Sequence, residues 1–120
     1  MPASSIASLG LSNQQTEKVG YARTCKWRYE GETISDSYLV MLSIFDYLAM
    51  EDVVGTNIKP VPKIGRHDAV TYTPPYDVGC ALSIAVAEKT RVDTMTVGGD
   101  GEKGCQLMRQ VAELAEPYLP

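Results

Sequence analysis

Two stretches of the chain alternate larger apolar residues with polar or small ones, at the period of two that a half-buried β-strand shows. In residues 22–29, Trp27 stands between Lys26 and Arg28, and in residues 80–87 large apolar side chains alternate with alanine and serine. Each stretch predicts a strand with one face turned toward a hydrophobic core. We expect Trp27 to lie on that face, buried under the terminal helix together with Leu107, Val111 or Leu114.

Residues 38–45 are apolar at nearly every position, which is typical of an interior strand covered on both faces. Prolines are frequent after this strand and exclude long regular ladders there. Residues 58–64 and 69–72 therefore predict two short strands, which form an edge hairpin around a turn at 65–68.

Helical patterns are expected at three places. Residues 4–9 predict a short first helix that Gly10 ends, and Asp46 can cap a short helix through Asp52. Residues 12–19 between the first helix and the first strand are polar and predict a loop. The closing segment has apolar residues at the spacing of one helix face: Leu107, Met108, Val111, Leu114, Ala115 and Tyr118.

These elements together predict an α+β fold, an antiparallel β-sheet with a short N-terminal helix and a C-terminal amphipathic helix packed on one face. The chain has 120 residues, of which 44% are hydrophobic and 22% charged. This composition is that of a globular protein, and the length suits a single domain spanning residues 1–120.

Charge and hydropathy narrow the classes of partner. The net charge is −4, and the basic residues are scattered instead of forming a block that could follow a phosphate backbone. We therefore expect no nucleic-acid partner. No apolar run approaches the roughly 20 residues that a membrane-spanning helix needs. We recognise no signal peptide ahead of the first helix and therefore expect either a cytosolic protein or one whose leader has been removed.

The hairpin that ends in residues 91–97 places two cysteines near one another. If its turn is centred on Lys89, Cys80 lies opposite Gly98, and Cys105 follows in the first turn of the last helix. Two cysteines at the same end of adjacent elements can meet the Cα separation of about 4.4–6.8 Å that a disulfide requires. We expect a Cys80–Cys105 disulfide, with two buried free thiols as the alternative.

The order and spacing of several segments resemble a family of actinobacterial lipoproteins of unknown function. The segments are Leu9-Gly10-Leu11, Cys25-Lys26-Trp27, residues 63–70, residues 79–86, Gly104-Cys105 and residues 111–120. The whole plan is more distantly similar to the extracellular sensor domains of mycobacterial serine/threonine kinases and to the PsbP-like fold.

The resemblance implies a lipid anchor, a location outside the cytoplasmic membrane, and a cysteine ahead of the first helix that pairs with the residue matching Cys25. This sequence begins Met1-Pro2-Ala3 and lacks that cysteine, so we expect Cys25 to be unpaired. Its neighbour Lys26 leaves a reactive thiol as a second interpretation.

Residues that could carry out chemistry are scarce. His67 is the only histidine, and it falls in the turn Gly65-Arg66-His67-Asp68, where we expect an ordinary polar loop residue. No zinc or calcium ligand spacing is present, and we expect no metal and no cofactor. Acidic residues in the glycine-rich segment 98–104 argue against phosphate binding there.

Aromatic residues give the best sequence-based candidate for a binding surface: Tyr38, Tyr47, Tyr72 and Tyr76. We therefore expect a non-enzymatic binding or interaction domain whose partner is an envelope protein, a peptide or a small molecule. The alternatives are a small envelope hydrolase that uses His67 with Asp68 or Asp46, and a purely structural spacer.

Overall fold

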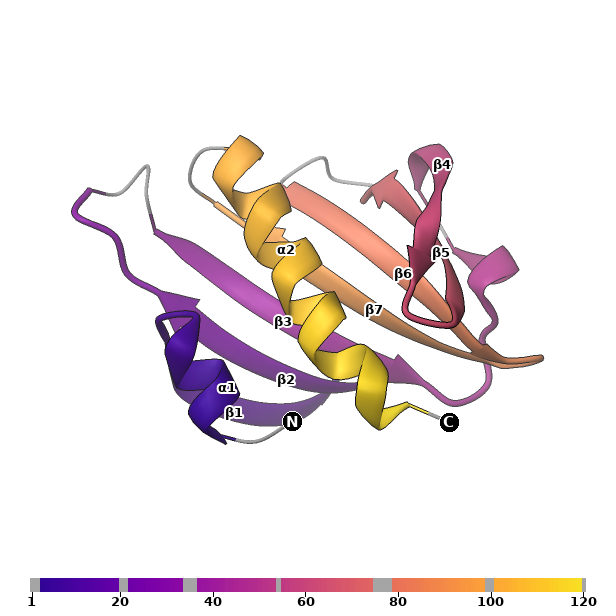
Figure 1. Cartoon of the computed structure of the whole chain (residues 1–120), viewed down its shortest axis with the longest axis horizontal. Helices are drawn as coiled ribbons and strands as arrows, with labels where there is room; N and C mark the ends of the chain where they lie inside the picture. Colours follow the sequence, from indigo (N-terminus) through magenta and orange to yellow (C-terminus); the bar gives the residue numbers. More distant parts are fainter. Residues whose placement is uncertain are drawn as a thin grey trace.

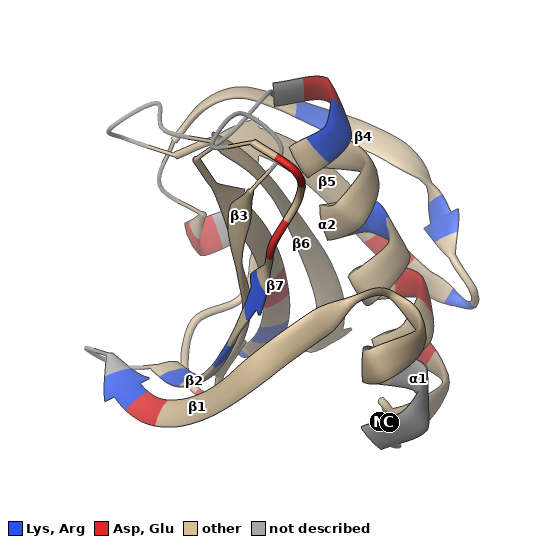
Figure 2. Cartoon of the chain, turned by 90° about the vertical axis from the view of Figure 1, so that its left-hand side faces the viewer, with Lys and Arg blue, Asp and Glu red and all other residues tan. Residues whose placement is uncertain are grey.

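Seven strands form one antiparallel sheet in the computed structural model, and two α-helices lie on the same side of it (Figures 1 and 2). The structure describes residues 3–19, 22–33, 37–53, 55–74, 79–98 and 101–119. The expected α+β fold is confirmed. The elements of this described part are α1 (Ala3–Ser8), β1 (Leu11–Val19), β2 (Ala22–Tyr29), β3 (Tyr38–Phe45), η2 (Met50–Asp52), β4 (Thr56–Ile64), β5 (His67–Thr73), β6 (Gly79–Ala87), β7 (Thr90–Val97), α2 (Gly101–Ala115) and η3 (Glu116–Tyr118).

The strand order is β1-β2-β3-β7-β6-β5-β4. Two antiparallel meanders, β1 to β3 and β4 to β7, are therefore joined where β3 pairs with β7. The last strand of the chain becomes the middle strand of the sheet. Side chains of β7 are consequently flanked by strands on both sides, and alternate ones face α2 or the opposite side of the sheet.

Most of the expected strands are confirmed, and β2 and β3 have the bounds that the pattern predicts. The prediction of a loop at residues 12–19 is wrong, because these residues form β1 and pair with β2. This is an edge strand whose described side chains are exposed except for Leu11. Such a strand gains its backbone hydrogen bonds from its neighbour without an apolar face, so hydrophobic periodicity does not reveal it.

The helix expected from Asp46 to Asp52 is reduced to the single 3-10 turn η2. Asp46 does not cap it, because its carboxylate binds the Arg23 guanidinium at 2.9 Å. The Asp52 carboxylate instead accepts a hydrogen bond from the backbone N–H of Ala49 at 2.8 Å.

The edge hairpin is confirmed as β4 and β5, joined by a turn at Gly65 and Arg66. Gly65 has a positive φ of 59°, a conformation that favours glycine. A Cβ at this position would also collide with the Glu116 carboxyl group of η3. The turn therefore needs a residue without a side chain.

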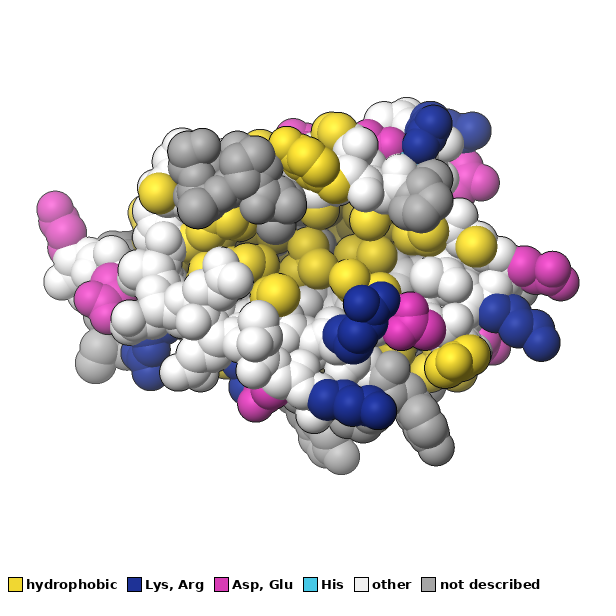
Figure 3. Space-filling model, turned by 90° about the horizontal axis from the view of Figure 1, so that it is seen from below, with side chains coloured by type: hydrophobic (Ala, Val, Ile, Leu, Met, Phe, Trp, Pro, Cys, Tyr) yellow, Lys and Arg dark blue, Asp and Glu magenta, His cyan; other side chains and the backbone are white. Residues whose placement is uncertain are grey.

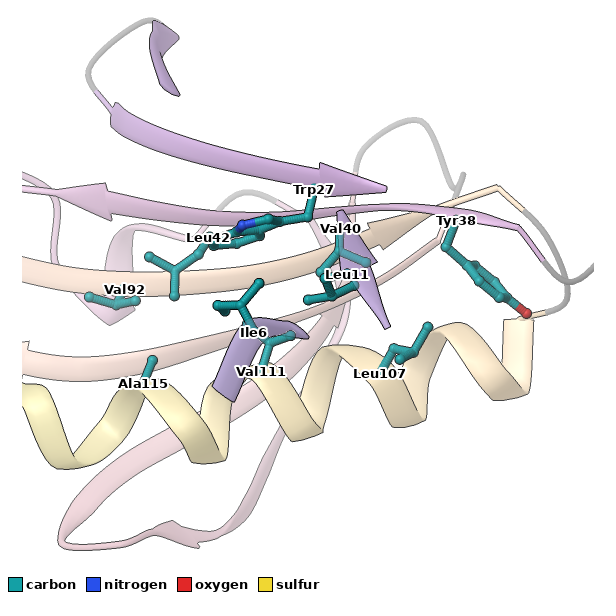
Figure 4. Close-up of a cluster of buried hydrophobic side chains, with 10 residues drawn as sticks. All are labelled: Ile6, Leu11, Trp27, Tyr38, Val40, Leu42, Val92, Leu107, Val111 and Ala115. Carbon is teal, nitrogen blue, oxygen red and sulfur yellow. The ribbon is translucent and has the colours of Figure 1, made fainter. Parts of the chain in front are cut away.

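The main hydrophobic core lies between the sheet and the two helices (Figure 4). Trp27 is 3% exposed there, and its indole N–H donates to Gln14 Oε1 at 3.1 Å. The prediction that Trp27 lies beneath the last helix with Leu107 and Val111 is confirmed. The remaining members of this cluster are Ile6, Leu11, Tyr38, Val40, Leu42, Val92 and Ala115.

A second apolar cluster lies between α2 and the β4–β5–β6 part of the sheet. Leu82 and Ile84 are fully buried there and contact the helix residues Met108 and Ala112. Tyr118, which we expected on the same apolar face, lies beyond α2 in η3 and is 61% exposed. The two clusters together contain five residues of α2: Leu107, Met108, Val111, Ala112 and Ala115.

Hydrophobic side chains also gather in the middle of the face that Figure 3 views. On the side of β2 and β3 that bears the helices, a recess of about 360 Å³ is lined by Cys25, Leu42 and Ile44 among others.

Among the described residues, no helix is both long enough and apolar enough to cross a membrane.

Candidate functional site

The four tyrosines do not form one exposed aromatic surface. Tyr38 is 4% exposed and belongs to the core beneath α2, whereas Tyr72 is 8% exposed and its hydroxyl contacts Asp93. Tyr47 is 80% exposed, and Tyr76 lies outside the described residues. The expected surface is thus corrected, because two of its members are buried in different places.

His67 does not lie in a solvated turn, as the sequence predicts, but begins strand β5. Its side chain is buried, and Nδ1 is 2.7 Å from Glu116 Oε1. The same carboxylate oxygen accepts a hydrogen bond from the backbone N–H of Arg66, and the Arg66 guanidinium donates to the Leu119 carbonyl. This cluster holds the C-terminal end of the chain against the β4–β5 turn.

The carboxylates named for the hydrolase alternative have other partners. Asp68 is exposed on the face of β5 opposite His67 and forms an ion pair with Lys63. Asp46 binds Arg23 at the surface. Among the described residues, no group of three or more His, Cys, Asp or Glu side chains could hold a metal ion.

The His67–Glu116 contact predicts an acid-dependent stability. The hydrogen bond from His67 lowers the pKa of the Glu116 carboxyl below its ordinary value. A carboxyl with a lowered pKa stabilises the fold above its unfolded pKa of about 4.5, and this stabilisation is lost as the pH falls through the folded pKa. We expect the Tm of Glu116→Gln to depend less on pH than that of the wild type between pH 5 and pH 3.

Thermal unfolding across this pH range checks the prediction. Glu113→Gln is the matched control, because Glu113 is exposed on α2 and has no partner among the described residues. Parallel profiles for Glu116→Gln and the wild type would show that the contact does not contribute.

The disulfide between Cys80 and Cys105 is present, with a Cα–Cα distance of 5.2 Å, and Cys25 is free. The predicted register is wrong by two residues, because Cys80 lies opposite Thr96 and not Gly98. The register shifts between Ala85 and Ala87 near the hairpin turn, and an irregularity of this kind is not visible in the residue pattern. The bond fixes α2 to β6.

The best-defined candidate site is on the other side of the sheet, away from both helices. It is a pocket of about 250 Å³ to which β2, β3, β5 and β7 all contribute, and we call it the open-face pocket. Its lining residues are Ala22, Thr24, Met41, Ser43, Phe45, Tyr72, Arg91, Asp93 and Met95.

The strand register explains why these residues meet. Arg91, Asp93 and Met95 alternate along β7 and so face the same side. On β3, Phe45 pairs with Arg91 and Met41 with Met95. The pocket therefore has one end formed by methionine side chains and another formed by an aromatic ring and charged groups.

A cluster of polar side chains is buried at the charged end. Arg91 is 6% exposed and Asp93 3%. The Arg91 Nε donates to Asp93 Oδ1 at 3.2 Å, and the Tyr72 hydroxyl donates to Asp93 Oδ2 at 2.6 Å. Burying charges is costly unless each is paired, and here both carboxylate oxygens are satisfied.

Burial shifts the protonation of two members of this cluster. It raises the pKa of Tyr72 far above its ordinary value, and the neighbouring Asp93 carboxylate adds to the effect. Burial also raises the pKa of Asp93, while the hydrogen bond from Tyr72 and the charge of Arg91 oppose it. Tyr72 therefore stays protonated at neutral pH and acts as a donor, not as a base.

Sequence reasoning named Tyr72 but missed the other residues of the cluster. One signal was available: Arg91 and Asp93 stand two residues apart in a predicted strand, so they share a face. The sequence does not reveal that this strand lies in the middle of the sheet, since its neighbour β3 is distant along the chain. If the central position of the strand is not known, the charges of Arg91 and Asp93 are typical of a solvated strand face.

The family model "Protein of unknown function (DUF3558)" matches residues 1–118 of the chain. Comparisons with curated proteins and with solved structures find no match.

Proposed function

The chain belongs to the DUF3558 family of proteins of unknown function, and we propose that it is a non-enzymatic domain that binds a small molecule in the open-face pocket. The observation that carries this proposal is the combination of apolar walls with a few buried polar groups at one end. Ligand sites typically have this composition. The pocket's volume of about 250 Å³ lies just below the roughly 300–1,000 Å³ of drug-sized sites, which favours a smaller ligand.

Binding is favoured over catalysis because the described groups of the pocket are poor at moving protons. None of the described residues that line it is a histidine or a cysteine, the side chains that most often serve as base or nucleophile near neutral pH. Tyr72 is held protonated, and Asp93 is occupied by two donors. These groups can orient a ligand without reacting with it.

The same proposal includes a location outside the cytoplasmic membrane, as the soluble part of an actinobacterial lipoprotein similar in plan to kinase sensor domains. Its supports are the sequence resemblance and the Cys80–Cys105 disulfide, a bond that forms and persists mainly in oxidising compartments. Fractionation of the native host, with the protein's acylation read by mass spectrometry, tests the location.

Methionine-methyl NMR tests the binding function directly. The chain has five methionines, of which Met41 and Met95 line the pocket, whereas Met108 belongs to α2 and is buried on the opposite side of the sheet. We expect toluene, as a small apolar probe, to shift the methyl signals of Met41 and Met95 and to leave Met108 unchanged.

A charge placed in the pocket should abolish these shifts. Met41→Glu adds a carboxylate to the apolar wall, whereas Met50→Glu makes the same exchange in η2, outside the pocket lining. The proposal predicts loss of binding in the first variant only. Unchanged Met41 and Met95 signals in the wild type at saturating toluene would contradict it.

A further inference from the structure

The guanidinium of Arg91 has a donor that the described protein does not use. Its Nε donates to Asp93, and its Nη1 donates to the Ala49 carbonyl at 3.2 Å. The structure shows no acceptor among the described residues for the second terminal nitrogen, Nη2, which carries two N–H groups. Arg91 is nevertheless 94% buried and lines the open-face pocket.

Three contacts fix the direction of this group. The Asp93 carboxylate accepts a hydrogen bond from Nε at one edge of the guanidinium. The carbonyl of Ala49, in the segment that follows β3, accepts one from Nη1. The Phe45 ring lies against its face, with the guanidinium carbon 4.1 Å from the ring centroid. A planar cation held at its edge and its face cannot turn away, so its unused N–H groups stay oriented without further loss of side-chain freedom.

We propose that the open-face pocket binds a small apolar molecule that ends in a carboxylate or carbonyl oxygen, and that this oxygen accepts a hydrogen bond from Arg91 Nη2. The inference rests on the proposed binding function and adds the ligand's chemical class. The apolar body of the ligand lies against Met41, Met95 and Phe45. Asp93 compensates the charge of Arg91, so the site accepts an uncharged carbonyl as well as a carboxylate.

The same arrangement disfavours a cationic ligand. A ligand ammonium would face the Arg91 guanidinium, and both oxygens of Asp93 are already occupied by Tyr72 and Arg91. Like charges placed close together in a partly desolvated site repel strongly. The selectivity should therefore follow the head group when the apolar body is kept constant.

Four probes with the same ring test this selectivity: benzoate, benzamide, toluene and benzylamine. Titrations followed by the Met41 and Met95 methyl signals should show benzoate or benzamide binding at least tenfold more tightly than toluene, and benzylamine more weakly than toluene. The order of benzoate and benzamide distinguishes a charged from an uncharged acceptor. If toluene binds and the acceptors gain nothing, the head-group inference fails while the binding function stands; if no probe binds, both fail.

Arg91→Lys tests the donor itself, because lysine keeps the positive charge but loses the planar fork of N–H groups. We expect the preference for benzamide over toluene to fall about tenfold, as for one lost charge-assisted hydrogen bond. Arg109→Lys on α2 is the matched control and should change neither affinity. Should Arg91→Lys fail to fold, the probe series on the wild-type protein still decides the inference.

Discussion

Replacing Trp27 with alanine is expected to lower the free energy of unfolding by about 3–5 kcal/mol, the range for truncating a large aromatic side chain in a core. Trp27 is 3% exposed and packs among side chains from both helices and from three strands. Its removal leaves a cavity beneath α2 that the surrounding backbone cannot close, because the sheet and the disulfide fix the helix. It also leaves Gln14 Oε1 without its donor.

Urea unfolding measures this effect, and it is followed by circular dichroism because the substitution removes the chain's single tryptophan. Tyr47→Ala is the control, since Tyr47 is 80% exposed and should change stability by less than about 0.5 kcal/mol. Trp27→Phe keeps most of the volume and should fall between the two. A Trp27→Ala variant as stable as the control would mean that the core is not assembled around this side chain.

The predictability of this fold depended on whether a strand has a buried face. Strand β2 alternates apolar and polar residues and β3 is apolar at nearly every position, so the bounds of both were predicted correctly. Strand β1 is polar because it lies at the edge of the sheet, and its stability comes from backbone pairing with β2, which side-chain patterns do not record. The sequence therefore reveals the interior of this sheet better than one of its edges.

The candidate site was harder to predict because it depends on contacts distant in the chain. Arg91 meets Phe45 only because β7 inserts beside β3, and Tyr72 reaches Asp93 from β5, two strands away. His67 shows the same limit, since its buried partner Glu116 lies 49 residues further along the chain. Local sequence indicates turns and faces, but not which faces come together.

Removing the disulfide, by Cys80→Ala together with Cys105→Ala, is expected to cost about 3–4 kcal/mol. The bond joins residues 25 positions apart, and closing a loop of this length removes entropy from the unfolded chain by about that amount. Such a loss is a large fraction of the roughly 5–15 kcal/mol that stabilises a typical domain. It should also loosen α2 from β6, because the bond is the covalent link between them.

Thermal unfolding with and without a thiol reductant separates this effect from changes in packing. Reductant should lower the Tm of the wild type toward that of the double variant and leave the double variant unchanged. Cys25→Ala is the control, because Cys25 is a free cysteine and its variant should respond to reductant as the wild type does. Mass spectrometry of the alkylated, non-reduced wild-type protein should find one labelled cysteine. Three labelled cysteines, or a wild-type Tm that does not change when reductant is added, would contradict the role assigned to the Cys80–Cys105 bond.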